Sequence, residues 1–393
     1  MKILHIISEG YPCGGAEKIL IKLKDNFEKK GHEIKILSSN LDPEFNHFSD
    51  FEFKSINSNN PMKIIFKLFN PYSFTALKKI LYEYKPDIVH LHTMEQITPS
   101  ALFLLRKYPT FMTLHGPETF IKSLVTWGLL PRFFHKKEMR ENNLTLIGRF
   151  HYFYHTYIQR YIYKLGFKNV DLFITPSNFI KQKAINDANP IKTIHNPIDL
   201  LEYSTIENNN TILFVGRLEK VKGVRYLIEA VPLIIKKIPN IQLYIVGDGQ
   251  EKDSLFELVN DIGLSSNIHF TGWQKSDDLK RYYRKTSVVI IPSIWPENFP
   301  TVCLEAMSMG RPVIGTKVGG IPEIIDDKVN GYLVKPKDSG QIAEKVIKLL
   351  LDKNLLKFMS KNSRLKSEKY NINNYVAKLE EVYEDIRRKY ENK

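Results

Sequence analysis

One stretch of the chain, residues 292–323, constrains the fold more than any other. It reads PSIWPENFPTVCLEAMSMGRPVIGTKVGGIPE, follows the apolar run SVVII, and contains the strand-like segment PVIGT. A buried strand, a polar loop, a helix start and a second strand follow one another, which is typical of an open α/β sheet. In such sheets ligands bind beyond the carboxyl ends of the strands, and helix N-termini attract anions. The stretch therefore predicts a ligand site rather than a core element.

Two carboxylates in this stretch, Glu297 and Glu305, are separated by seven residues. We place Glu297 in the loop and Glu305 in the helix, where they can accept hydrogen bonds from sugar and ribose hydroxyls. Phe299, Thr301 and Val302 lie at the expected helix start, where backbone N–H groups have no partner within the helix and suit a phosphate. A carboxylate pair also suits general acid–base work, as in glycoside hydrolysis, so that alternative stays open here.

A basic turn earlier in the chain favours binding over hydrolysis. The segment GRLEKVKG follows a strand-like run and opens a helix, so it brings Arg217 and Lys222 to that junction. An Arg fork and a Lys point charge beside a helix start suit a diphosphate, and a solvated basic turn is the alternative. Glycoside hydrolysis would leave both cations without a role.

Strand-like and helix-like segments alternate along all 393 residues, which exceed one ordinary core. We predict two α/β/α domains, residues 1–197 and 198–370, followed by a terminal helix, 371–393. The opening MKILHIISEG resembles a strand rather than a cleavable signal, and no apolar run approaches the ~20 residues of a spanning helix. Cys13 and Cys303 suit reduced thiols, and we expect a cytoplasmic protein.

The first half offers its own candidate residues. The loop YPCGG lacks the GxGxxG fingerprint, yet Gly14 and Gly15 would let backbone N–H groups approach a phosphate or sugar, unless the loop is only a tight turn. Two strand-like segments end in histidines: PDIVHLHT carries His90 and His92, and PTFMTLHG carries His115. We single out His115 as functional, because histidines at the carboxyl ends of parallel strands suit a ligand cleft. A purely structural histidine is the alternative.

A basic, aromatic insertion at about 120–165 is the most unusual segment. The net charge is +14, and residues 101–168 hold eleven Lys or Arg but three Asp or Glu. Twelve aromatic residues fall between positions 120 and 167, where we expect helices. This composition favours contact with an anionic membrane or lipid. A helical insertion with an aromatic core and a nucleic-acid surface are the alternatives.

Together the motifs resemble a known family. GRLEKVKG, VGDG, the stretch 292–323 with its E-x7-E spacing, and NGYLV resemble the retaining nucleotide-sugar glycosyltransferases of family 4. YPCGGAEKIL, DIVHLHT and TLHG extend the resemblance over most of the chain. It implies the GT-B fold, in which two Rossmann-like α/β/α domains face a central cleft. The C-terminal helix crosses back to pack on the N-terminal domain.

The resemblance also implies that the C-terminal domain binds a nucleotide diphosphate sugar and the N-terminal domain binds the acceptor. Arg217 and Lys222 match the cations that hold the diphosphate. Glu305 matches the carboxylate that binds ribose, and Glu297 matches the one that faces the sugar. These four residues form the predicted centre of the donor site.

Further positions match family residues around the donor. The base is expected near Gly272 and Trp273. Gly15, beside Gly14, matches the glycine loop that closes on the donor, and His115 matches the residue near the anomeric carbon. The sequence departs from the family where Pro300 replaces a common glycine, which removes one N–H contact.

The resulting hypothesis is transfer of a sugar from a UDP- or GDP-sugar to a hydroxyl of a glycan or lipid-linked acceptor, with retained configuration. We expect a role in cell-surface polysaccharide biosynthesis, at the inner face of the cell membrane. The cations make a metal unnecessary, and no cofactor beyond the co-substrate is expected. The alternatives are a nucleotide-sugar epimerase or phosphorylase, a non-catalytic homologue that binds sugar nucleotides, and a basic nucleic-acid-binding protein. We expect no nucleic-acid partner.

Overall fold

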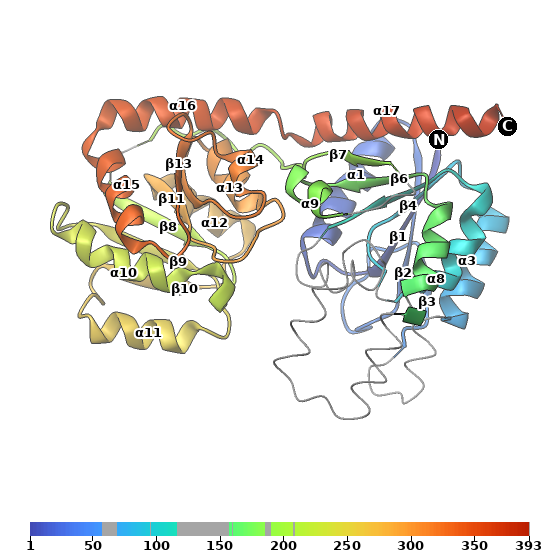
Figure 1. The fold of residues 1–393 in the computed structure, drawn as a ribbon, viewed down its shortest axis with the longest axis horizontal. Coiled ribbons are helices and arrows are strands. Elements are labelled where there is room, and N and C mark those ends of the chain that lie inside the picture. The colour runs from blue at the N-terminus through green and yellow to red at the C-terminus, as the bar shows by residue number, and fades with distance from the viewer. Residues whose placement is uncertain are drawn as a thin grey trace. The chain divides into compact units, whose positions relative to one another are not determined.

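The computed structural model describes residues 1–56, 69–94, 96–115, 157–158, 160–184, 190–206 and 209–392. The chain forms two compact units (Figure 1). Unit 1 comprises Met1–His195 together with Ile372–Lys393, and unit 2 comprises Asn196–Asn371. Unit 1 is therefore assembled from two separate parts of the chain, whereas unit 2 is continuous.

The described part of unit 1 is built on a seven-stranded parallel sheet. Its strands are β1 (Lys2–Glu9), β2 (Glu33–Ser39), β3 (Phe51–Phe53), β4 (Ile88–Leu91), β5 (Thr110–Thr113), β6 (Leu172–Thr175) and β7 (Ile191–Thr193). The spatial order is β3-β2-β1-β4-β5-β6-β7. The order reverses between β1 and β4, so this pair forms the topological switch point, where open α/β sheets bind ligands.

Helices cover both faces of this sheet. They are α1 (Gly15–Lys29), α3 (Pro71–Tyr84), α4 (Pro99–Leu102), η1 (Phe103–Lys107), α8 (Arg160–Gly166), η3 (Phe167–Asn169), α9 (Asn178–Lys183) and α17 (Ile372–Glu391). Side chains alternate between the faces along a strand. Leu4 and Ile6 of β1 therefore share a core with α3, α4 and α8, whereas Ile3 shares one with α1 and α17.

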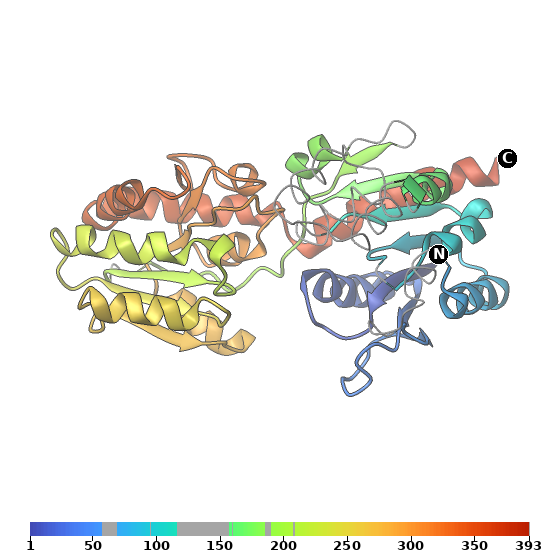
Figure 2. The same ribbon diagram turned by 60° about the horizontal axis from the view of Figure 1, so that its bottom comes forward.

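Helix α17 follows unit 2 in the sequence but belongs to unit 1, where it lies along the sheet (Figure 2). Tyr375, Leu379 and Tyr383 recur every four residues and are buried, which gives the helix one apolar face. They join Phe27 of α1 and Phe111 of β5 in a single core. Burial of this face secures the terminal helix on unit 1.

Unit 2 repeats the same plan with a six-stranded parallel sheet. Its strands are β8 (Thr211–Val215), β9 (Gln242–Val246), β10 (Ile268–Gly272), β11 (Val288–Ile291), β12 (Val313–Thr316) and β13 (Gly331–Val334). The order β10-β9-β8-β11-β12-β13 reverses between β8 and β11. These two strands therefore form the switch point of unit 2.

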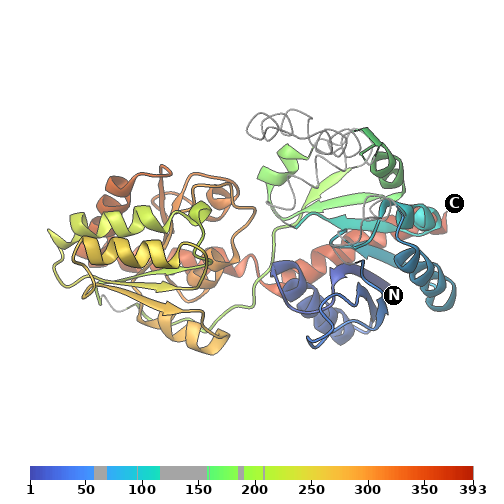
Figure 3. The ribbon, with the colours of Figure 1, turned by 90° about the horizontal axis from the view of Figure 1, so that it is seen from below.

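The helices of unit 2 also lie on both faces of its sheet (Figure 3). They are η4 (Lys220–Lys222), α10 (Val224–Ile235), α11 (Lys252–Asp261), α12 (Ser276–Lys285), α13 (Thr301–Ser308), α14 (Ile321–Ile324), α15 (Ser339–Leu351) and α16 (Lys353–Glu368). Helices α10, α11, α15 and α16 share one core, and α12, α13 and α14 share the other. The predicted α/β class and its alternation of strands and helices are confirmed.

The structure adds elements that the sequence analysis left out, chiefly α3 and α16. Both have side-chain caps: Asn70 accepts hydrogen bonds from the first turn of α3, and Asp352 does so for α16. Most of the expected helical insertion at 120–165 lies outside the described residues, which include α8 near its end. Among the described residues, no helix has the length and apolarity needed to cross a bilayer.

Candidate functional site

The carboxyl ends of β8 and β11 carry the residues that the sequence singled out in unit 2. The turn after β8 contains Arg217 and η4, and the loop after β11 contains Glu297 and leads into α13. Because β8 and β11 are the strands at which the sheet order reverses, this is the position where an α/β sheet of this type offers a crevice. The topology therefore supports the predicted location of the site.

Lys222 and Glu297 form the centre of this site. Lys222 Nζ lies 2.7 Å from Glu297 Oε1, and Ser293 Oγ donates a hydrogen bond to the same oxygen at 2.6 Å. The two charged side chains are 23% and 15% exposed. Charge-assisted hydrogen bonds of this kind fix the orientation of a carboxylate. The structure thus brings two predicted donor residues together and pairs them with each other.

Close backbone contact positions Lys222 beside the loop after β11. Ile294 N donates a hydrogen bond to Val221 O at 2.9 Å. Gly223 has a φ of +68°, and a Cβ atom at this position would lie 2.2 Å from Pro292 O. Only glycine allows both this backbone conformation and this approach. The glycine therefore determines how closely η4 approaches Glu297.

A second glycine contact fixes Glu297 from the other side. Gly320 N donates a hydrogen bond to Glu297 O at 2.7 Å. Gly319 has a φ of +58°, and a Cβ atom there would lie 2.0 Å from Glu297 O. Thr316, at the end of β12, donates from Oγ1 to Ser293 O at 2.7 Å. Gly319 and Gly320, within the stretch 292–323, thus help to hold the Glu297 backbone in place.

Glu305 lies on α13 and accepts a hydrogen bond from Tyr283 Oη at 3.2 Å. Burial, followed by the charge of Glu305, raises the pKa of Tyr283 well above its usual value. The phenol therefore keeps its proton and remains a donor to the carboxylate. Tyr283 comes from α12, and the sequence pattern gave no signal for it, because the contact joins residues from two helices.

The start of α13 lies where the sequence predicted it. Thr301 and Val302 are its first two residues, and Pro300 precedes them in an extended conformation. The side chain of Phe299 is only 4% exposed, and its ring packs edge-on against Tyr370 at 5.5 Å. Phe299 is therefore a core residue by its side chain, and only its backbone can contribute to a phosphate site.

Three other predicted residues lie at the carboxyl ends of β8 and β10. The Arg217 side chain is 64% exposed, and its Nη1 lies 2.7 Å from Glu219 Oε1. Gly272 ends β10 with a φ of +69°, and Trp273, directly after it, is 70% exposed. Arg217 is thus paired with Glu219, whereas Lys222 is paired with Glu297.

In unit 1, the glycine loop begins α1 at the carboxyl end of β1. Gly14 is the N-cap residue and Gly15 is the first residue of the helix. A Cβ atom at Gly15 would meet nothing within 4 Å, whereas one at Gly14 would lie 2.8 Å from Glu17 Oε2. Gly15 is exposed and therefore accessible to a ligand.

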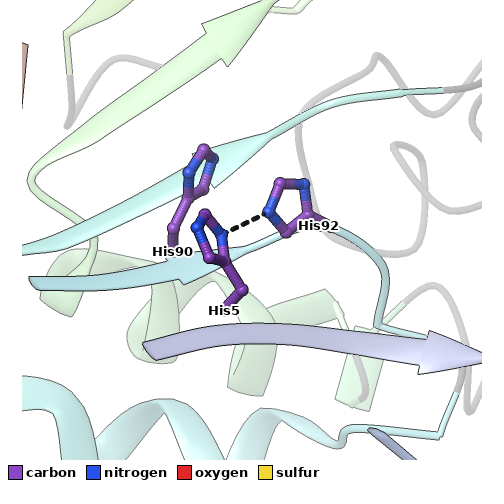
Figure 4. A group of neighbouring side chains, drawn as sticks. All are labelled: His5, His90 and His92. Carbon is purple, nitrogen blue, oxygen red and sulfur yellow. Dashed lines mark hydrogen bonds between the residues drawn. The ribbon is translucent and has the colours of Figure 1, made fainter. Parts of the chain in front are cut away.

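Three histidines of unit 1, His5, His92 and His115, form a row linked by hydrogen bonds. His115 Nε2 lies 2.9 Å from His92 Nδ1. His92 Nε2 lies 2.9 Å from His5 Nδ1, a contact drawn in Figure 4. His5 and His92 are buried, and His115, after β5, is partly exposed. Desolvation lowers the pKa of His115 to about 4, and desolvation with a smaller effect of Lys24 lowers that of His5 to about 3. These imidazoles are therefore neutral near pH 7.

His90 has different partners. Its Nε2 lies 2.7 Å from Thr113 Oγ1, and its Nδ1 contacts the hydroxyl of Tyr383 on α17. His5 and Tyr383 were not among the predicted residues. His5 on β1 pairs with His90 on β4, which places it beside the other histidines. This pairing depends on the strand order, so the sequence alone did not indicate it.

The fold defines a class of proteins built from two Rossmann-like α/β units, each with a switch point in its parallel sheet. Two family models identify the family. Residues 13–201 match Glycosyltransferase Family 4, and residues 201–366 match Glycosyl transferases group 1. The chain belongs to the group 1 glycosyltransferases of the family 4 type.

Related sequences carry the same activity class. The chain is 39% identical over 178 residues to an uncharacterized glycosyltransferase of Methanocaldococcus jannaschii, a match that spans 45% of each protein. It is 24% identical over 394 residues to N-acetyl-alpha-D-glucosaminyl L-malate synthase of Bacillus anthracis, which spans 96% of both. The chain thus spans less than half of the first relative and nearly all of the second. The predicted enzyme class, a glycosyltransferase, is confirmed.

Solved structures share the fold. Sucrose-phosphate synthase from Thermosynechococcus elongatus superposes with a TM-score of 0.73 at 20% identity, over 98% of both chains. Anabaena HepE, solved in complex with UDP-glucose, superposes with a TM-score of 0.66 at 21% identity, over 98% of this chain and 100% of HepE. These similarities confirm the GT-B fold.

Proposed function

We propose that this glycosyltransferase moves a sugar from a UDP- or GDP-sugar to a hydroxyl of a glycan or lipid-linked acceptor, with retained configuration. The observation that carries the proposal is the Lys222–Glu297 pair at the switch point of unit 2. It combines a cation suited to a diphosphate with a carboxylate suited to a sugar. The binding of UDP-glucose by the structural relative HepE supports a nucleotide-sugar donor.

The ion pair has a direct role in this reaction. Both described contacts of the Glu297 carboxylate use Oε1, so Oε2 can accept a hydrogen bond from a sugar hydroxyl. As the bond between the anomeric carbon and the phosphate oxygen breaks, negative charge gathers on the departing diphosphate. Lys222 and the N–H groups at the start of α13 stabilise that charge. The acceptor oxygen bonds to the anomeric carbon on the same face, and its proton passes to the departing phosphate.

The remaining donor contacts follow from the same arrangement. Glu305 binds the ribose hydroxyls, and the base lies near Gly272 and Trp273. The exposed side chain of Arg217 can leave Glu219 and join Lys222 on the diphosphate, because a surface ion pair contributes only about 0–1 kcal/mol. These cations take the place of a divalent metal, so we expect activity to survive chelation.

A donor panel tests the proposal. The full chain is incubated with UDP- and GDP-sugars, with and without membrane extract, and release of the nucleoside diphosphate is measured. We expect release with one donor class that increases when extract is present and persists with chelator. Product formed from the donor alone, without release of the diphosphate, would instead identify an epimerase. The absence of turnover with every donor would contradict the proposal.

We also propose that the acceptor is presented by an anionic membrane that contacts unit 1. The supporting surface, here called the basic aromatic face, is the outer side of α3, α4, η1, α8 and η3, which contact one another. Its exposed cations and aromatic residues are Tyr72, Lys78, Lys79, Tyr82, Phe103, Arg106, Lys107, Tyr161, Lys164 and Lys168. The sequence of these five elements contains one acidic residue, Glu83. Cations and aromatic rings together suit the interface of an anionic bilayer.

Neutralising two cations of the basic aromatic face is expected to weaken membrane binding. Lys78→Gln combined with Lys107→Gln should lower the partition into vesicles of phosphatidylcholine and phosphatidylglycerol roughly thirtyfold, because each surface cation contributes about 1 kcal/mol. Flotation at low salt measures this. Lys252→Gln combined with Phe256→Ser, on α11 of unit 2, is the control and should change binding little. Equal binding by all variants would contradict the proposed face.

A further inference from the structure

Two hydrogen-bond donors share a single oxygen of the Glu297 carboxylate. Lys222 Nζ lies 2.7 Å from Oε1, and Ser293 Oγ donates to the same atom at 2.6 Å. Oε2 accepts no hydrogen bond from a described residue, and it is not one of the buried side-chain atoms that lack a partner. One oxygen of the carboxylate therefore receives two hydrogen bonds, while the other is open to solvent.

The two donors differ in how firmly they are fixed. The Lys222 ammonium sits on a flexible four-carbon stem, and its side chain is 23% exposed. Ser293 is buried, and its hydroxyl is joined to the backbone by a single side-chain carbon. The lysine can therefore change its partner when an anion binds nearby, whereas the serine stays where its backbone holds it.

The backbone of Ser293 is itself held by neighbouring segments. Thr316, at the end of β12, donates from Oγ1 to Ser293 O at 2.7 Å. On one side of Ser293, Pro292 O lies so close to Gly223 that a Cβ atom there would be 2.2 Å away. On the other side, Ile294 N donates to a backbone carbonyl of η4 at 2.9 Å. Contacts from two segments thus fix the position of the Ser293 hydroxyl.

Donor binding creates a competition for Lys222. In the proposed transfer reaction, on which this inference rests, the Lys222 ammonium stabilises the departing diphosphate while Glu297 accepts a hydrogen bond from the sugar. An ammonium that turns toward the diphosphate no longer orients the carboxylate. The hydrogen bond from Ser293 is then the described side-chain contact that remains on Oε1.

We propose that Ser293 is a positioning residue that holds the Glu297 carboxylate toward the sugar while Lys222 binds the diphosphate. Its hydroxyl keeps Oε1 in place, so Oε2 stays directed at a sugar hydroxyl. Hydrogen bonds to a charged acceptor are roughly twice as strong as those between neutral groups, which suits this task. The free enzyme thus stores Lys222 on Glu297, and the bound donor releases the lysine without releasing the carboxylate.

The competing interpretation is that Ser293 only fills space in the loop after β11. Its burial fits both roles, but the two roles differ in the ligands that they affect. A defect in packing would disturb the binding of a nucleoside diphosphate and of its sugar donor alike. Loss of the orientation of Glu297 would disturb only the ligand that carries a sugar.

The first experiment compares the binding of a nucleoside diphosphate with that of the matching donor. Calorimetric titration of the full chain gives Kd values for UDP and UDP-glucose, and for GDP and GDP-mannose. In Ser293→Ala we expect the ratio of the donor Kd to the diphosphate Kd to rise roughly tenfold, because a hydrogen bond to a charged group is lost. Lys222→Ala should weaken both ligands and leave this ratio unchanged. An unchanged ratio in Ser293→Ala would overturn the proposal.

Two further variants separate the hydrogen bond from packing. Ser360 on α16 is also buried in unit 2, and its hydroxyl has no hydrogen-bond partner in the described part of the chain. Ser360→Ala is therefore the matched control and should leave the ratio of Kd values within twofold of wild type. Ser293→Cys fills the space of the hydroxyl with a weak donor, so it should resemble Ser293→Ala. A wild-type ratio in Ser293→Cys would show that Ser293 only fills space.

A double substitution tests whether Ser293 acts through Glu297. Alone, Ser293→Ala should lower kcat/KM for the donor roughly tenfold. In a Glu297→Ala background it should cause no further loss, because the positioned carboxylate is absent. A persistent tenfold loss in that background would overturn the inference.

The binding measurements separate this inference from the proposed function. If wild type turns over none of the donors in the panel, the proposed function fails, while the ratio of Kd values still decides the role of Ser293. If wild type binds neither the diphosphates nor the donors, both the proposed function and this inference are wrong.

Discussion

Lys222→Ala is expected to lower kcat/KM for the donor roughly 100- to 1,000-fold. Lys222 is the predicted diphosphate cation that the structure pairs with Glu297, the carboxylate predicted to face the sugar. A pre-positioned group that stabilises charge developing on the leaving diphosphate contributes about 3–4 kcal/mol to catalysis. The loss should appear mainly in kcat, because the charge grows as the glycosidic bond breaks. Steady-state release of the nucleoside diphosphate measures it.

Lys220 provides the matched control for this experiment. It lies in the same η4 turn but is exposed, so Lys220→Ala should change turnover less than twofold. The Glu297 carboxylate keeps its hydrogen bond from Ser293 in both variants. Donor turnover of Lys222→Ala within twofold of wild type would refute the assignment of Lys222 to the diphosphate.

Gly223→Ala is expected to have the second large effect, on stability as well as on activity. The new Cβ would lie 2.2 Å from Pro292 O, at a backbone φ of +68°. Left-handed strain and overpacking against backbone each cost about 1–3 kcal/mol, so unit 2 should lose about 2–6 kcal/mol of unfolding free energy. The shift of η4 away from Pro292 should also separate Lys222 from Glu297. Urea denaturation and donor turnover measure the two effects.

Gly263→Ala separates strain from contact. Gly263 has the same φ of +68°, but a Cβ atom there would meet nothing within 4 Å. It should therefore cost only the left-handed strain, about 1–2 kcal/mol, and leave turnover unchanged. If the two alanine variants had the same free energy of unfolding, the close approach of Gly223 to Pro292 would contribute nothing to the loss of stability.

The architecture was predictable because its signals are local. Apolar runs of four to eight residues, glycine-rich turns and amphipathic segments alternate along the chain, and each type marks a strand, a turn or a helix. Helix α3 was missed although Asn70 and Pro71 form an N-cap and first-residue signature that could have revealed it. Helix α16 was missed because it follows α15 after a single residue, Asp352, with no turn segment between them.

The candidate site was predictable only in part. Arg217, Lys222, Glu297 and Glu305 come from two segments whose place after strands can be inferred from sequence. Their pairing could not be inferred, because the contact of Lys222 with Glu297 depends on the order of β8 and β11 in the sheet. The same holds for Tyr283 beside Glu305. Contacts between distant elements need the strand order, which no local pattern encodes.

The histidines show this limit most clearly. His92 and His115 were recognised from their motifs, but His5 sits inside a strand that gave only an apolar signal. Its proximity to His92 follows from the register that pairs His5 with His90 across β1 and β4. Burial also lowers the pKa of these histidines, so their rings are neutral near pH 7. That burial is visible only in the structure.

The division of unit 1 into two chain segments has a consequence for biosynthesis. A ribosome makes residues 1–195 first, then all of unit 2, and only afterwards the segment of α17. The core that α17 shares with α1 includes Tyr375, Leu379 and Tyr383 of α17, so nascent unit 1 lacks part of this core until α17 has been made. Unit 2 can meanwhile complete its own core during translation. A chain released early would therefore carry a complete unit 2 but an incomplete unit 1, which exposes it to chaperones and proteases.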